Sequence, residues 1–112
     1  MTTQEFYNQH LRLLEERDVE KIVDLDYHED ATMLILTGDE PRIVHGKPAI
    51  KELFTGYLEY VYRGFVSTEK LALSEDSIFL EATIDTVNGH LKVYDGLYLK
   101  DGKIFRHFTG IK

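Results

Sequence analysis

An Asn-Gly pair, Asn88-Gly89, constrains the fold most, because it separates two segments in which apolar and polar residues alternate. Both residues tolerate positive φ, and such a pair is the strongest short-range signal for a two-residue hairpin loop. With these residues as the loop, Ile78 is predicted to face Leu99 and Ala82 to face Asp95. In that register the aliphatic side chains of both strands lie on one face of the sheet.

A carboxylate interrupts this aliphatic face. Within the segment 90–100, the aliphatic residues at every second position share their face with Asp95. Burying a carboxylate among such side chains costs free energy unless it is paired, protonated or open to water. Because the small Ala82 is expected opposite Asp95, we predict an apolar pocket with this carboxylate at its centre. Alternatively, a hydrogen bond from a buried hydroxyl such as that of Tyr57 satisfies Asp95 within a packed core.

The rest of the chain predicts three helices and further strands. The first helix opens at Thr3, the second follows an N-cap at Asp18 and ends before Tyr27, and the third has Pro48 in its first turn and closes at Gly64. Strands are predicted over residues 32–37, 42–45, 65–73, 78–87, 90–100 and 103–111. Helices followed by a long, strongly curved and mainly antiparallel sheet make an α+β arrangement, with the helices on the concave face.

The last hairpin has two possible registers. If Asp101-Gly102 alone forms the loop, Arg106 shares the inner face with Asp95. If Lys100 joins a three-residue loop with a left-handed glycine, His107 lies on that face instead, directly opposite Asp95. The aliphatic and aromatic residues of the strand fit both registers.

Length and composition restrict the class of protein. A chain of 112 residues fits one domain spanning 1–112. A formal charge of -7 repels a phosphate backbone, so no nucleic acid partner is expected. The absence of cysteine excludes disulfides and thiolate metal sites, and without a glycine-rich phosphate loop or a His-x-x-x-His pair we expect no cofactor and no metal. The apolar runs are short and the N-terminus lacks a signal-like core, so we expect a cytoplasmic protein with no membrane contact.

Five short motifs, in their order and spacing, resemble those of a known superfamily. They are Arg17-Asp18-Val19, Asp30-Ala31-Thr32, Glu40-Pro41-Arg42, Gly46 with Ala49-Ile50, and Asp101-Gly102-Lys103-Ile104. Over nearly the whole chain this pattern resembles the nuclear transport factor 2-like superfamily, also called the cystatin-like α+β barrel, and within it the SnoaL-like and ketosteroid isomerase-like proteins. The resemblance implies a cone-like fold with N-terminal helices packed on a curved sheet.

The resemblance also assigns positions to the site. The catalytic base of the steroid isomerases falls on Ile35, so the base is missing and a true ketosteroid isomerase is disfavoured. The helix-one tyrosine of those enzymes falls on His10, their protonated aspartate on Asp95, and a pocket-lining position on His107. SnoaL-like cyclases are similar in placing an acid/base aspartate near Asp95.

These observations leave two classes of function. In the first, Asp95, His107 and His10 transfer a proton on a small hydrophobic carbonyl compound, as in an isomerase, dehydratase or cyclase. Desolvation alone would raise the pKa of Asp95, whereas a nearby histidine would reverse that shift and form an ion pair. In the second, the fold is a non-catalytic ligand-binding or dimerisation module. The expected pocket residues beside Asp95 are Phe54, Tyr57, Ala82, Val93, Leu97 and Ile35.

The outer face of the sheet is expected to be rich in aromatic side chains. Phe79, Tyr94 and Tyr98 are predicted to point away from the helices. This is more apolar surface than a monomer needs, so we predict a homodimer that pairs through the convex sheet face.

Overall fold

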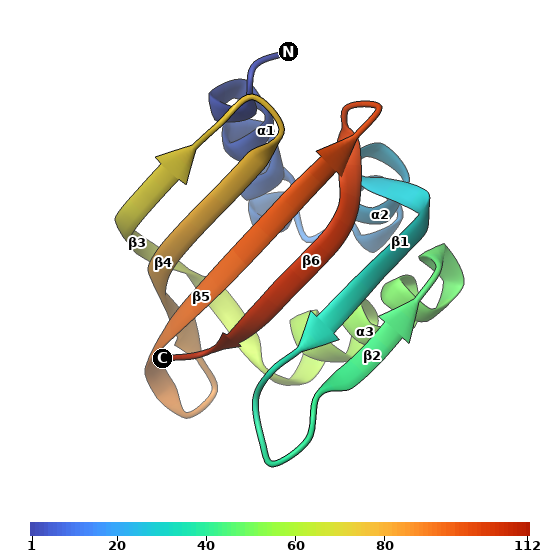
Figure 1. The fold of residues 1–112 in the computed structure, drawn as a ribbon. Helices are drawn as coiled ribbons and strands as arrows, with labels where there is room; N and C mark the ends of the chain where they lie inside the picture. The colour runs from blue at the N-terminus through green and yellow to red at the C-terminus, as the bar shows by residue number, and fades with distance from the viewer.

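Three helices cover one face of a six-stranded sheet in the computed structural model, which describes residues 1–112 (Figure 1). The predicted α+β class is confirmed. The elements are α1 (Thr3–Glu16), α2 (Val19–Asp26), β1 (Tyr27–Ile35), β2 (Arg42–His45), α3 (Lys47–Tyr60), β3 (Tyr62–Leu73), β4 (Ser77–Thr86), β5 (Gly89–Lys100) and β6 (Lys103–Ile111).

The sheet is open, with the strand order β2-β1-β6-β5-β4-β3. All neighbouring strands are antiparallel except β1 and β6, which run parallel. Three register shifts interrupt the pairing of β3 with β4. Such irregularities bend and twist a strand, which helps the sheet to curve around the helices. None of the helices has the length and apolar character needed to cross a bilayer.

The helix ends follow local capping chemistry. Thr2, one residue before the predicted start, forms a reciprocal capping box with Glu5. The predicted N-cap at Asp18 is confirmed, because its side chain accepts a hydrogen bond from the Lys21 amide at 3.2 Å. At the far end of α3, the Arg17 guanidinium donates to the backbone carbonyl of Leu58, which lacks a continuing helix to bond it.

Two predicted boundaries are wrong by four or more residues. The first strand begins at Tyr27 and not at residue 32, because Tyr27 is fully buried and its backbone already pairs with Ile104 of β6. A register shift between Tyr27 and Thr32 breaks the alternation that would have revealed this earlier start. Gly64 does not close α3, which ends at Tyr60; instead it pairs with Asp85 inside the sheet.

The predicted register of the Asn88-Gly89 hairpin is wrong by two positions. Gly89 pairs with Thr86, so the loop residues are Val87 and Asn88. The Thr86 hydroxyl donates to the Gly89 carbonyl at 2.7 Å and accepts from the Asn88 amide at 3.2 Å, which holds the turn in this position. A shift of two positions keeps every side chain on its predicted face.

The shift changes the neighbours of Asp95. Leu80, and not Ala82, faces Asp95 across the strands, and Ala82 faces Val93. The inward direction of the Asp95 side chain is therefore as expected, while the argument that a small residue opposes it is wrong.

The final hairpin combines the two registers left open by the sequence. Lys100 pairs with Lys103, so Asp101-Gly102 alone forms the loop, with both residues at positive φ. A register shift then follows between the pairs at Leu99 and Tyr98. This bulge places His107 opposite Leu97 on the inner face, while Thr109 is the direct partner of Asp95.

Candidate functional site

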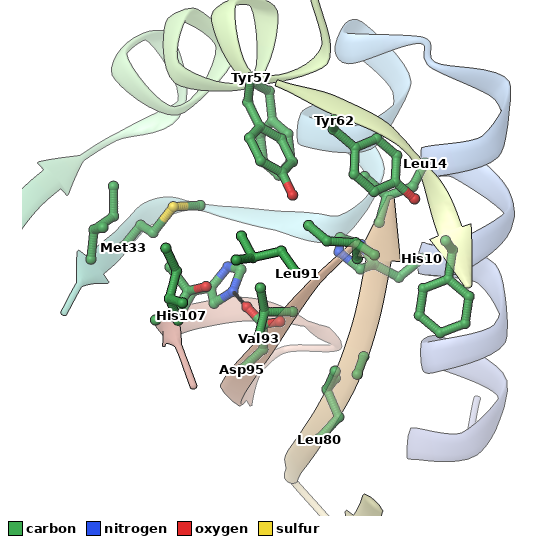
Figure 2. Close-up of a pocket in the computed structure, with 18 of the residues that line it drawn as sticks. His10, Leu14, Met33, Tyr57, Tyr62, Leu80, Leu91, Val93, Asp95 and His107 are labelled. Carbon is green, nitrogen blue, oxygen red and sulfur yellow. Dashed lines mark hydrogen bonds and ion pairs between the residues drawn. The ribbon is translucent and has the colours of Figure 1, made fainter. Parts of the chain in front are cut away.

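A cavity of about 290 Å³ lies between the helices and the inner face of the sheet (Figure 2). Of its 24 lining residues, 18 are hydrophobic, so each polar group on the wall has few polar neighbours. The walls come from α1, α3 and the strands other than β2. A cavity of this size and character is typical of sites for small organic molecules.

The structure places all nine candidate residues of the sequence analysis on this cavity. They are His10, Ile35, Phe54, Tyr57, Ala82, Val93, Asp95, Leu97 and His107. Their catalytic and binding roles stay predictions, since a place on the wall says nothing of what the wall binds.

Asp95 and His107 form a hydrogen-bonded pair on the sheet side of the cavity (Figure 2). His107 Nε2 lies 2.7 Å from Asp95 Oδ1. The Asp95 side chain is 22% exposed and that of His107 only 8%. The carboxylate is therefore the more accessible member of the pair.

The pKa of Asp95 reports this environment. Desolvation raises it, but the hydrogen bond and charge of His107, a hydrogen bond from Thr109 and the charge of His10 together bring it below its ordinary value. Asp95 is accordingly a carboxylate at neutral pH. In this respect it differs from the protonated aspartate that the family resemblance implied for this position.

Tyr27 holds the other nitrogen of His107. Its hydroxyl lies 2.8 Å from His107 Nδ1, and the two rings are stacked with centroids 6.0 Å apart. Burial raises the pKa of Tyr27 well above its usual value, and the charges of Asp95 and Asp26 raise it further, so the phenol stays neutral. Tyr27 is not among the predicted site residues, because the first strand was predicted to start five residues later, at residue 32.

His10 forms a second pair, on the helical side of the cavity. His10 Nδ1 lies 2.6 Å from Asp26 Oδ2, and Gln9 Nε2 donates to Asp26 Oδ1 at 2.8 Å. Asp26 is completely buried. Asp26 is not among the predicted site residues, although it lies four residues after the buried Ile22 and therefore on the same face of α2.

Tyr57 supplies a further hydroxyl, from α3. Figure 2 shows this hydroxyl pointing into the cavity. Burial, with smaller contributions from Asp95 and Tyr62, raises the pKa of Tyr57, so it is a neutral hydrogen-bond donor. The hydroxyl has no partner among the protein side chains, and the alternative in which it satisfies Asp95 is not what the structure contains, because His107 pairs with that carboxylate.

The arrangement offers acid/base groups and no evident metal ligands. No three His, Asp or Glu side chains are grouped so that they could hold a metal ion. The cavity instead brings together a carboxylate, an imidazole and a phenol from the strand β5 and the helices α1 and α3. Such groups can accept a proton, donate one and hydrogen-bond a developing oxyanion.

No protein-family model matches the sequence, and no curated protein does so significantly. Solved structures do match. An NTF2-like protein of unknown function from Mesorhizobium loti aligns with a TM-score of 0.82 at 14% identity, over 98% of this chain and 90% of that one. SalBIII, an epoxide hydrolase/cyclase-like enzyme with a role in pyran ring formation in salinomycin, aligns with a TM-score of 0.78 at 20% identity. The alignment covers 97% of this chain and 89% of that one.

A steroid delta-isomerase from Pseudomonas aeruginosa aligns with a TM-score of 0.75 at 20% identity, over 97% of this chain and 78% of that one. At these identities the likeness concerns the fold, which supports many unrelated chemistries. The resemblance drawn from the sequence motifs is confirmed at that level: the chain has the nuclear transport factor 2-like fold, which it shares with proteins described as isomerases and cyclases.

Proposed function

We propose that the cavity binds a small hydrophobic carbonyl compound and that Asp95, held by His107, exchanges a proton with it. The observation that carries this proposal is a carboxylate, 22% exposed, on the wall of a cavity whose lining is mostly apolar. An apolar molecule gains free energy on entering such a cavity, at about 25 cal/mol for each Å² of apolar surface removed from water. The carboxylate is then the charged group that such a molecule meets.

The proton transfer follows from the positions of three side chains. Asp95 takes a proton from the carbon next to the carbonyl group, and the electron pair of the broken C–H bond moves toward the carbonyl oxygen. The Tyr57 hydroxyl donates a hydrogen bond to that oxygen as its negative charge develops. The proton then returns from Asp95 to another atom of the same molecule, which is an isomerisation.

The apolar Ile35 fits this assignment. It lines the cavity where the resemblance placed the base of the steroid isomerases, so the proton acceptor must come from another strand. Asp95 on β5 is the carboxylate that reaches the cavity. The structural neighbours include a steroid delta-isomerase and a cyclase-like enzyme, which favours this class of chemistry.

The test uses a panel of small apolar ketones in two measurements. A thermal-shift screen identifies those that raise the Tm, and NMR in D2O then follows exchange of the hydrogens next to the carbonyl. We expect the native protein to speed the exchange of at least one bound ketone and Asp95→Asn to lose this effect. A panel that neither raises the Tm nor exchanges faster would contradict the proposal.

We further propose that the outer face of the sheet pairs with a second copy of the chain. Phe79, Tyr98 and Phe108 are 43%, 43% and 42% exposed there. Phe79 and Phe108 flank Gly96 directly across the strands, which leaves a shallow apolar depression between the two rings. Exposed aromatic side chains that are contiguous in this way favour an interface. Pairing through this face leaves the cavity on the opposite face accessible.

A further inference from the structure

The two histidines of the cavity are held differently by their neighbours. We propose that Asp26 is a positioning residue that fixes His10 as the Nδ1–H tautomer, so that His10 Nε2 is a second atom that exchanges protons with a bound molecule. His107, in contrast, acts through Asp95. The chemistry at His10 Nε2 rests on the proposed function, whereas the tautomer does not.

Both nitrogens of His107 are occupied. Because Asp95 is a carboxylate, His107 Nε2 must donate to it, at 2.7 Å. The Tyr27 hydroxyl lies 2.8 Å from Nδ1, and in the neutral imidazole that nitrogen accepts the phenolic hydrogen. Neutral His107 is therefore the Nε2–H tautomer, and neither nitrogen is free to meet a molecule in the cavity.

Only one nitrogen of His10 is occupied. His10 Nδ1 lies 2.6 Å from Asp26 Oδ2. A carboxylate can only accept, so we infer that Nδ1 carries the hydrogen and that the lone pair of the neutral ring is on Nε2. His10 Nε2 has no hydrogen-bond partner in the protein. The Tyr62 hydroxyl is the one fully buried side-chain polar group without a partner, so Nε2 must keep some accessible surface. Because His10 lines the cavity, we infer that the accessible Nε2 can be reached from it.

The ring of His10 is held in place from three sides. The Phe6 ring stacks on it at a centroid distance of 6.3 Å, and the Tyr27 ring meets it edge-on at 6.2 Å. Asp26 is itself held by the amide of Gln9. A buried carboxylate with two hydrogen bonds fixes both the orientation and the tautomer of an imidazole.

One junction of the fold sets both histidines. Asp26 is the last residue of α2 and Tyr27 the first of β1, and these neighbours hold Nδ1 of His10 and Nδ1 of His107 respectively. When His10 Nε2 takes up a proton, its lone pair forms the new N–H bond, and the electron pair of the broken bond stays on the substrate. The resulting imidazolium would be stabilised by the Asp26 carboxylate through Nδ1–H.

The experiment is long-range 1H–15N NMR of the imidazole rings at a pH of about 8, above the ordinary histidine pKa of about 6.5. In the native protein we expect a proton-bearing Nδ1 and a bare Nε2 for His10, and the reverse for His107. A proton on Nε2 of neutral His10 would overturn the proposal. This native measurement needs no variant and no ligand.

The variant Asp26→Asn makes the test sharper. Gln9 donates to the Oδ1 side of residue 26, so an asparagine is expected to keep its oxygen there and to turn its NH2 group toward His10. That group donates to Nδ1, so His10 should switch to the Nε2–H tautomer. His107 in the same spectrum is the internal control and should not change. If His10 keeps its native tautomer in this variant, the positioning role of Asp26 is wrong.

A matched pair of probes tests the access to Nε2. Phenol and toluene have nearly the same shape, but only phenol has an O–H group that can donate to a bare nitrogen. We expect phenol to shift the Nε2 resonance of His10 in the native protein and toluene to leave it in place. If phenol causes no shift, Nε2 is closed to the cavity and the proton-exchange role fails. If phenol does shift it but no ketone exchanges protons, the proposed function fails alone.

Discussion

Two carboxylates on neighbouring strands, Asp95 on the inner face and Glu81 on the outer face, both have a lowered pKa, for different reasons. At Glu81 the main causes are hydrogen bonds from Lys112, at 2.5 Å, and from Lys70, at 3.2 Å. At Asp95 the largest influence is desolvation, which acts in the opposite direction and is overcome by His107 and Thr109. The outer carboxylate is neutralised by cations, whereas the inner one borders an apolar cavity.

The comparison teaches that position, and not charge alone, decides what a carboxylate can do. Lysine side chains keep their protons at neutral pH, so Glu81, whose side chain is 11% exposed on the outer face, stays paired with two partly exposed cations. The partner of Asp95 is an imidazole, which is itself an acid/base group, and this pair lines the cavity where a bound molecule can meet it. The predictions below test this difference between the two faces.

The largest expected effect concerns proton exchange. We expect Asp95→Asn to slow the protein-catalysed exchange of a bound ketone about 10²- to 10⁴-fold, the usual contribution of a general base. The matched variant Glu81→Gln should exchange at the native rate, because Glu81 faces away from the cavity. NMR in D2O measures both rates, and an equal loss in the two variants would contradict the comparison.

The sequence correctly predicted on which face of the sheet Asp95 lies, but it did not predict which residues lie opposite it. The two-residue period alone placed Asp95 inside, because a register error of two positions does not change the face of any residue. It could not supply the register, which depends on the side chain of Thr86 in the turn. Nor could it choose between Arg106 and His107, because a bulge, and not the loop length, sets their direction.

The two residues that hold the histidines, Asp26 and Tyr27, were the hardest to predict from the sequence. Asp26 and Tyr27 lie where α2 runs straight into β1, with no turn residues to mark the boundary. Charged residues follow at Glu29 and Asp30, so the early part of the strand has the composition of a turn. Their partners are distant in the sequence, at Nδ1 of His10 and of His107.

A smaller effect is expected at Tyr57. The variant Tyr57→Phe keeps the ring and removes the hydroxyl that would bond the carbonyl oxygen. Because one hydrogen bond contributes about 0.5–1.5 kcal/mol, we expect about a two- to tenfold weaker affinity for the ketone. Isothermal titration calorimetry measures the affinity, and Tyr60→Phe, at a residue 68% exposed on the same helix, is the control. Equal affinities in all three proteins would rule out the hydrogen bond.

A substitution on the outer face should change dimerisation without changing ketone binding in the cavity. We expect Phe79→Lys to shift the chain from dimer to monomer, because a charge in the apolar depression must be desolvated on pairing. Sedimentation velocity over a range of concentrations measures the association, and ketone binding should remain at the native level. If the native chain is a monomer at every concentration, the pairing proposal is wrong.

The smallest effect concerns stability in acid. The folded pKa of Asp95 lies below the unfolded value of about 3.9, so its contribution is fully present above that pH and is lost as the pH falls through the folded pKa. The difference in the free energy of unfolding between the native protein and Asp95→Asn should therefore narrow below a pH of about 4. Urea denaturation over a pH series measures it.

Added salt should affect the stability contributions of Asp95 and Glu81 differently in the same urea denaturation. Added salt should reduce the corresponding effect of Glu81→Gln, because its lysine partners are 71% and 52% exposed, but should leave that of Asp95→Asn nearly unchanged. An equal response to salt at both positions would show that salt screens the Asp95–His107 pair as strongly as the lysine pairs of Glu81.

The parallel pairing of β1 with β6 has a consequence for how the protein folds during its synthesis. The hydrogen bond between Tyr27 and His107 closes a loop of 80 residues, and it depends on the last strand of the sheet. Contacts so remote in sequence form slowly, since the entropy of closing the loop must be overcome first. A chain still emerging from the ribosome can fold its helices and early hairpins, but it can have no complete cavity until β6 docks between β1 and β5.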